Sequence, residues 1–243
     1  MRELRAGAEK VIERRKKPPA DEFFSRYWAN AEPVVFTDAT KGWKLWSPLD
    51  MKRLVGDVSI KVARGRFRKE FTKTTVARFV DDVVLAKKPE DLYLVSNSFA
   101  MDAPGMQPLL ERIVIDPTYF KVGSMKRGSA LWLGPKGTVT PLHHDTTNVL
   151  FHQIHGRKEL TLVSPFSSNV LDETDGYYGD PRAKRRAERV VLEPGDALFL
   201  PAGWWHEVRA LDASISFSLL AFKKPNSFAW YQPGFGDQVE GEL

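Results

Sequence analysis

Three residues of types that bind metal ions stand in two apolar segments of this 243-residue chain. His143 and Asp145 are two positions apart, in a segment that we expect to form a β-strand. Because residues i and i+2 of a strand point to the same side, both side chains can bind one ion. His206 comes much later, at the end of a segment that opens with Pro194 and Gly195. That order predicts a tight turn and then a buried strand, which would bring a second imidazole to the ion.

Two imidazoles and one carboxylate on one side of a metal leave the opposite coordination positions open. This ligand set is typical of non-haem Fe(II) oxygenases. The alternative is that the three side chains are ordinary polar residues of strands, which would leave them buried without partners at a cost of several kcal/mol each. A bound metal removes that cost, so we predict that His143, Asp145 and His206 form a catalytic metal site.

The other ionisable residues near the predicted site have simpler interpretations. His144 should point away from the ion, because neighbouring residues of a strand alternate in direction. His152 is expected to be structural, and His155, which precedes a glycine, to be exposed. Lys158 begins the next apolar strand, where spacing alone favours a surface lysine whose ammonium reaches solvent. A metal-bound dicarboxylate would give a different reason for a cation at this position.

The composition indicates a folded protein with one large domain. Hydrophobic residues make up 42% of the chain, and seven residues are Trp, which is enough apolar material for a large core. The chain has no cysteine, which excludes thiolate metal sites and fits a reducing compartment, so a cytoplasmic location is expected. No apolar stretch is long enough to cross a bilayer. The first basic cluster is followed by Pro18 and Pro19 rather than by the apolar run of a signal peptide.

The net charge is +5, and short basic clusters occur at 14–17, 64–69 and 184–186. A surface for nucleic acid is one interpretation. Solvated loops and helix ends are favoured, because the clusters are scattered and carry no nucleic-acid motif. We therefore expect no nucleic-acid partner and no membrane. The sequence leaves the oligomeric state open, and a homodimer is compatible with it.

The first half of the chain mixes helices with short strands. Apolar residues at helical spacing predict the helices. Ser47 followed by Pro48, with an acid three residues after the serine, is typical of a helix start. The predicted helices are residues 2–17, 21–29, 47–56, 74–87 and 109–113, and the predicted strands are 33–36, 58–63 and 91–95.

From Ser129 onward, short strands are separated by turn residues. The predicted strands are 129–133, 138–145, 148–155, 157–163, 190–192, 197–200, 204–210 and 213–222. Many short strands after a helical section predict a mainly β fold with a helical N-terminal decoration, built as a β-sandwich or jelly roll. The polar segment 166–189 is too long for a hairpin and predicts a binding loop or lid. The expected organisation is an N-terminal helical extension (1–20) and a single domain (21–243) made of an α/β prelude (21–128), a β core (129–222) and a tail (223–243).

Together, these segments resemble the JmjC-type, cupin-like Fe(II)- and 2-oxoglutarate-dependent hydroxylases, and especially the small JmjC-only protein hydroxylases. The matching stretches are 131–145, 153–158 and 194–211. The resemblance implies a double-stranded β-helix that uses Fe(II), 2-oxoglutarate as cosubstrate and O₂. It also implies that the iron ligands are His143, Asp145 and His206.

The resemblance implies roles for residues around the iron as well. Lys158 matches the lysine that binds the distal carboxylate of 2-oxoglutarate. The hydroxyls of Thr140 and Tyr93 match groups that assist this lysine. Trp132 matches an aromatic residue at the mouth of the active site, where substrate enters.

Two positions depart from the family pattern. Val149 stands where the family often has an asparagine that touches the metal-proximal end of the cosubstrate, and Asn148 lies one residue earlier. Asn148 would contribute to cofactor binding if a bulge turned it toward the site. Close relatives have Trp where this chain has Leu220, so we expect an altered substrate pocket. Ser218 keeps a small polar group on the cofactor side.

The leading interpretation is an oxygenase that hydroxylates an unactivated C–H bond, of a protein or peptide side chain. One alternative is a hydroxylase of a free amino acid or natural product with the same metal core. Two others are a catalytically silent binding module and a sugar-isomerase-like or storage cupin. The intact triad and Lys158 argue against a silent module. Demethylation of histone lysine is a further activity of the family, which we rank below hydroxylation.

Overall fold

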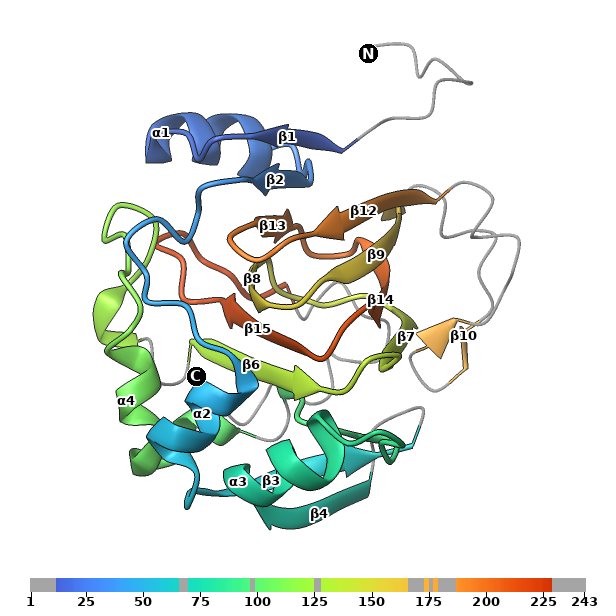
Figure 1. The fold of residues 1–243 in the computed structure, drawn as a ribbon. Helices are drawn as coiled ribbons and strands as arrows, with labels where there is room; N and C mark the ends of the chain where they lie inside the picture. Colours follow the sequence, from blue (N-terminus) through green and yellow to red (C-terminus); the bar gives the residue numbers. More distant parts are fainter. Residues whose placement is uncertain are drawn as a thin grey trace, which may run out of the picture.

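Two facing β-sheets form the body of the computed structural model, which describes residues 12–65, 70–96, 99–124, 128–165, 173–174, 177–178 and 187–228 (Figure 1). The larger sheet has the strand order β1-β2-β13-β8-β15-β6. Its strands are β1 (Glu13–Arg15), β2 (Val34–Phe36), β6 (Ser129–Gly134), β8 (Val149–His155), β13 (Ala197–Leu200) and β15 (Ser214–Leu219). All its pairings are antiparallel except that of β1 with β2.

The smaller sheet has the order β12-β9-β14-β7 and is antiparallel throughout. Its strands are β7 (Val139–His143), β9 (Lys158–Val163), β12 (Glu188–Leu192) and β14 (Trp205–Ala210). From β6 onward the chain alternates between the sheets, except where β9 is followed by its neighbour β12. This winding is a double-stranded β-helix, so the predicted jelly roll and its eight core strands are confirmed.

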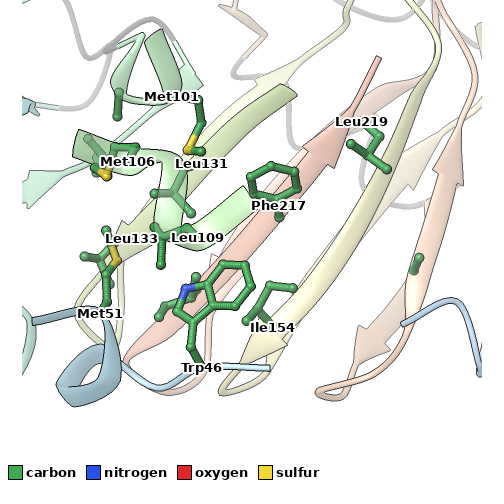
Figure 2. Packing of buried hydrophobic residues seen from close by; sticks show 14 of the residues in the cluster. Trp46, Met51, Met101, Met106, Leu109, Leu131, Leu133, Ile154, Phe217 and Leu219 are labelled. Atoms are coloured by element: carbon green, nitrogen blue, oxygen red, sulfur yellow. The ribbon is translucent and has the colours of Figure 1, made fainter. Parts of the chain in front are cut away.

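Both sides of the larger sheet are buried, which explains its nearly continuous apolar strands. On β13, Leu198 and Leu200 pack between the sheets, whereas Ala197 and Phe199 belong to the cluster on the helical side. Figure 2 shows that helical side, where Phe217 of the sheet lies among labelled apolar residues of the sheet and of the helical segments. The core therefore has two layers, one on each side of the sheet.

The helical layer comes mainly from the first half of the chain. The helical elements are α1 (Ala20–Glu22) continuing into η1 (Phe23–Trp28), α2 (Pro48–Val55), α3 (Val76–Phe79) continuing into η2 (Val80–Val84), η4 (Ala100–Asp102), η5 (Pro104–Met106), α4 (Gln107–Leu110) and η6 (Val122–Ser124). A three-stranded sheet of order β4-β3-β5 accompanies them: β3 (Ser59–Arg64), β4 (Glu70–Thr75) and β5 (Leu92–Tyr93). These strands lie beyond β6, at the end of the molecule opposite α1, β1 and β2 (Figure 1).

Backbone hydrogen bonds join the small sheet to the jelly roll. Leu94 and Leu133 exchange both of theirs, at 2.9 and 3.1 Å. This bridge fixes Tyr93 beside β6, which matters for the site below. The predicted start of α2 is also confirmed: the Ser47 hydroxyl accepts from the Asp50 backbone N–H, and the Asp50 carboxylate accepts from that of Ser47. The hydrogen bonds that the Ser47 backbone N–H and hydroxyl donate to this carboxylate lower the pKa of Asp50.

Two predictions for the N-terminal half are wrong in part. The helix predicted at 2–17 is a strand at 13–15, because pairing with β2 and the ion pair between Arg14 and Asp196 (2.6 Å) outweigh a thin apolar stripe. Residues 1–11 lie outside the described part of the chain. The helix predicted from residue 74 begins at Val76, because Thr74 and Thr75 close the unpredicted strand β4 against β3.

The predicted loop at 166–189 falls largely outside the described residues. Of it, the structure describes two short paired strands, β10 (Glu173–Thr174) and β11 (Tyr177–Tyr178), and the start of β12. The tail from 229 onward also lies outside. Among the helices that the structure describes, none has the length and apolar character needed to cross a membrane.

Candidate metal centre and its pocket

The three predicted metal ligands converge between the two sheets. His143 ends β7, Asp145 follows it by two residues, and His206 lies on β14 directly opposite His143. Their ligand atoms all lie within 4.8 Å of one another. The His206 Nε2 atom is 3.8 Å from a carboxylate oxygen of Asp145. One ion can therefore contact all three side chains.

The hydrogen bonds of the two histidines leave Nε2 available for a metal. His143 Nδ1 donates to the Pro141 carbonyl at 2.7 Å, and His206 Nδ1 donates to the Trp204 carbonyl at 3.0 Å. A carbonyl can only accept, so each Nδ1 carries the ring proton and each Nε2 presents a lone pair. Burial also lowers the pKa of His206 to about 4, which keeps that ring neutral. The donor set fits a divalent metal such as Fe(II).

A β-bulge in β7 shapes this side of the site. His206 pairs with His143 but Val208 pairs with Thr140, so Pro141 and Leu142 together oppose a single residue of β14. Proline is tolerated in a bulge because it has no N–H to place in the ladder. The extra residue puts Thr140 on the same side as His143, although three positions separate them, and both line the pocket.

A cavity of about 240 Å³ opens beside the metal ligands. Eight of the ten predicted site residues line it: Tyr93, Trp132, Thr140, His143, Asp145, His206, Ser218 and Leu220. The rest of its described wall is mostly apolar. Asp145 is the only acidic residue among the described lining residues.

Lys158 lies just behind the cavity wall. Its side chain is 1% exposed, and its ammonium donates to the Tyr93 hydroxyl at 2.8 Å. The Nζ atom also lies 5.2 Å from the centre of the Phe151 ring. Burial lowers the pKa of Lys158 to about 7. The expectation of a surface lysine from spacing alone is therefore wrong.

Backbone geometry around Lys158 requires two glycines. Gly156 has φ of +64° in the turn before β9, and a Cβ there would lie 2.2 Å from the Ala213 carbonyl oxygen. A Cβ on Gly134 would lie 2.6 Å from the Tyr93 ring. These glycines allow the tight turn and leave room for the tyrosine that contacts Lys158.

Trp132 and Ser218 are diagonal neighbours on β6 and β15 of the larger sheet, where Trp132 pairs with Ser216. The Trp132 indole N–H donates to the Ser218 hydroxyl at 3.1 Å. Leu220 follows β15 on the same side, and all three side chains line the cavity. Trp132 and Leu220, which were predicted to contact substrate, thus line the same cavity as Ser218, which was predicted on the cofactor side.

Asn148 is the predicted site residue that the structure turns away from the cavity. Its side-chain oxygen accepts from the Ala202 backbone N–H at 2.8 Å, and it does not line the pocket. The bulge that would have turned it inward does not occur there, since β8 begins only at Val149. Asn148 was expected to contact the cofactor, but in the structure its side chain joins two loops instead.

The remaining histidines lie outside the cavity. His144 packs edge-on against Trp205, with ring centres 4.2 Å apart. His152 is buried on the helical side, where it donates to the Phe217 carbonyl at 3.1 Å and stacks on Trp43, so its predicted structural role is confirmed. His155 was predicted to be exposed but is half-buried, and burial lowers its pKa.

Several lining residues were not predicted, although alternation along the strands would have found some of them. Leu160 lies two residues after Lys158, and Val208 two residues after His206. Phe151 lies on β8, two residues after Val149, and both line the cavity. Residues at i and i+2 share one side of a strand.

Comparison with known proteins agrees with this geometry. A family model described as a cupin-like domain matches residues 20–220. Lysine-specific demethylase 8 of Xenopus tropicalis is 30% identical over 87% of this chain and 53% of its own length. JmjC domain-containing protein D of Dictyostelium discoideum is 26% identical over 88% of this chain and 57% of its own. Lysine-specific demethylase JMJ30 of Arabidopsis thaliana is 27% identical over 86% of this chain and 54% of its own length.

The chain spans about half the length of these curated relatives. The matched region contains the whole jelly roll, from α1 to the end of β15. The family match and the metal-ligand geometry point the same way. The chain belongs to the cupin-like JmjC family of Fe(II)- and 2-oxoglutarate-dependent oxygenases.

Proposed function

We propose that this chain hydroxylates an unactivated C–H bond, on the side chain of a protein or peptide. The observation that carries the proposal is Lys158, a buried cation placed beside an open metal site. Within the described residues, no carboxylate forms an ion pair with it. An uncompensated buried charge is costly, and a dicarboxylate chelated by the metal would supply the missing counter-charge.

The chain's own residues divide the work in this proposal. His143, Asp145 and His206 hold Fe(II). Lys158 binds the far carboxylate of 2-oxoglutarate by a charge-assisted hydrogen bond, with the Tyr93 hydroxyl orienting the ammonium. When bound, Fe(II) and 2-oxoglutarate supply the oxidising chemistry: 2-oxoglutarate and O₂ become succinate and CO₂, and one oxygen atom enters the C–H bond.

The cavity wall excludes water from that oxidant and selects the substrate. Apolar side chains, among them Phe151, Leu160 and Leu200, line the described part of the cavity wall around the metal ligands. With Asp145 committed to the metal, the described lining offers no further carboxylate for a cationic group. This favours hydroxylation of an uncharged side chain over demethylation of lysine, the activity for which two of the relatives are named.

The test is substrate-independent formation of succinate, measured together with Mn(II) binding. Wild type should bind Mn(II) and, with Fe(II), O₂ and 2-oxoglutarate, form succinate slowly. Asp145→Ala should lose both, whereas the matched control Asp57→Ala, at an exposed aspartate, should keep both. Succinate formation at the wild-type rate by Asp145→Ala would refute the ligand assignment. A search by intact mass for products heavier by one oxygen atom, across peptides and free amino acids, then separates the two substrate classes.

A free amino acid or natural product remains the second candidate, because the cavity of about 240 Å³ also suits a small molecule. A silent binding module predicts no succinate under any condition. The two enzymatic candidates share every step at the metal and differ only in what fills the cavity.

A further inference from the structure

The pairing of β7 with β14 places His143 opposite His206, but Asp145 lies beyond that ladder, where two loops meet. One is the ligand loop, residues 144–148, which carries Asp145 between β7 and β8. The other is the turn at 201–204, which leads into His206. The Gly203 backbone N–H donates to the Asp145 carbonyl at 3.0 Å, and the Ala202 N–H donates to the Asn148 side chain at 2.8 Å. Two hydrogen bonds thus join the loop that carries Asp145 to the turn that leads into His206.

One side chain from the segment after β15 fastens the ligand loop. The side-chain oxygen of Asn226 accepts from the Asn148 backbone N–H at 2.8 Å. Its side-chain nitrogen donates to the Asn148 carbonyl at 2.9 Å and to the Leu220 carbonyl at 2.7 Å. The amide therefore satisfies both backbone groups of Asn148, as a partner strand would.

This contact also joins opposite walls of the cavity. Leu220 lines the cavity from the β15 side, whereas the ligand loop borders it from the β7 side. Phe228 adds a second tie, since its backbone N–H donates to the Thr146 carbonyl at 2.9 Å. Asn226 itself is not among the residues that line the cavity.

We propose that Asn226 is a positioning residue of the metal site: through Asn148 it holds Asp145 at the distance from His206 that one ion requires. The inference rests on the proposed metal site. Groups that orient metal ligands from outside the coordination shell change metal affinity by about 10- to 100-fold when removed. A purely structural contact would change thermal stability and leave the coordination geometry alone.

Three variants of the full chain test this. Asn226→Ala removes all three hydrogen bonds. Asn226→Asp keeps the shape and the acceptor but loses both donors, and it sets a carboxylate against the carbonyls of Asn148 and Leu220. Ser227→Ala, at the exposed neighbouring position, is the control. The measurements are the Mn(II) dissociation constant, the visible spectrum with Co(II), and the melting temperature of the metal-free protein.

Both Asn226 variants should bind Mn(II) about 10- to 100-fold more weakly and shift the Co(II) spectrum. The Mn(II) affinity of Asn226→Asp should be no higher than that of Asn226→Ala. Ser227→Ala should match wild type. Wild-type Mn(II) affinity and an unchanged Co(II) spectrum in Asn226→Ala would overturn the inference and leave the proposed function standing. If Asn226→Ala does not fold, the same result in the isosteric Asn226→Asp overturns it. Failure of wild type to bind Mn(II) would refute the proposed function itself.

Discussion

The buried ammonium of Lys158 makes the binding of 2-oxoglutarate depend on pH. Burial lowers its pKa to about 7, so the free protein loses the proton of this lysine within the neutral range. A carboxylate bound to Lys158 favours the charged form of the lysine, so Lys158 stays protonated in the complex. The apparent dissociation constant for 2-oxoglutarate should therefore follow the fraction of free protein in which Lys158 is protonated.

The magnitude follows from that pKa. The protonated fraction falls from about nine-tenths at pH 6 to about one-tenth at pH 8, so the dissociation constant should rise about tenfold over this range. With the ordinary lysine pKa of 10.5, the same range would change it by less than about 1%. Calorimetric titration of 2-oxoglutarate into the Mn(II)-loaded protein distinguishes the two cases.

Two variants serve as controls for this titration. Lys158→Arg keeps a charge throughout and should remove the pH dependence. Tyr93→Phe removes the hydrogen-bond partner of the ammonium but not its charge, so it should weaken binding while the rise with pH remains. A dissociation constant that stays constant from pH 6 to pH 8 in wild type would refute the assignment of Lys158 as the carboxylate-binding group.

Further predictions concern stability in chemical denaturation. Lys158→Met should stabilise the metal-free protein at pH 7 by up to about 4 kcal/mol, because it removes the desolvation of a buried cation; lower stability would contradict this. Burial lowers the pKa of His152 to about 4, whereas the unfolded chain has the ordinary value of 6.5. The unfolded state therefore binds more protons below pH 6.5, and His152 should lower the stability by about 3 kcal/mol as the pH drops from 6.5 toward 4. His206, whose pKa burial also lowers to about 4, adds to the fall over the same range in the metal-free protein. His152→Gln should reduce that slope by the His152 contribution, and an unchanged slope would exclude His152 as a source. Ala31 has φ of +48°, and its carbonyl accepts from the Trp204 indole at 2.9 Å. Ala31→Gly should relieve the strain and stabilise the fold by up to about 1 kcal/mol without changing Mn(II) affinity, and destabilisation would contradict it.

The core strands could be predicted because the sequence carries their local signals. The strands of the jelly roll are short apolar runs bounded by turn residues, and the eight predicted segments fall on β6 to β9 and β12 to β15. The start of α2 could be predicted for the same reason, because its capping residues lie close together in the sequence. The strand β1 was missed because its pairing with β2 depends on contacts far away in the sequence, such as that of Arg14 with Asp196.

The metal ligands were predictable for a related reason: their types and spacing are chemical signals in themselves. The bulge that brings Thr140 beside His143 was not, because the register between β7 and β14 is set by the whole sheet. The position of Asn148 is set by contacts of the loop before β8, such as the hydrogen bond from the Ala202 backbone N–H. The role of Asn226 could not be predicted, because a single asparagine in a polar segment carries no signal until the fold places it against the ligand loop.

The most direct measurement is a crystal structure with Mn(II) and a non-reacting 2-oxoglutarate analogue, with the metal located by its anomalous scattering. One peak should lie among His143 Nε2, the Asp145 carboxylate and His206 Nε2. The far carboxylate of the analogue should lie against Lys158 Nζ and the Tyr93 hydroxyl. A metal bound elsewhere, or an analogue whose far carboxylate avoids Lys158, would contradict the central claim that this cavity is the site of a 2-oxoglutarate-dependent oxygenase.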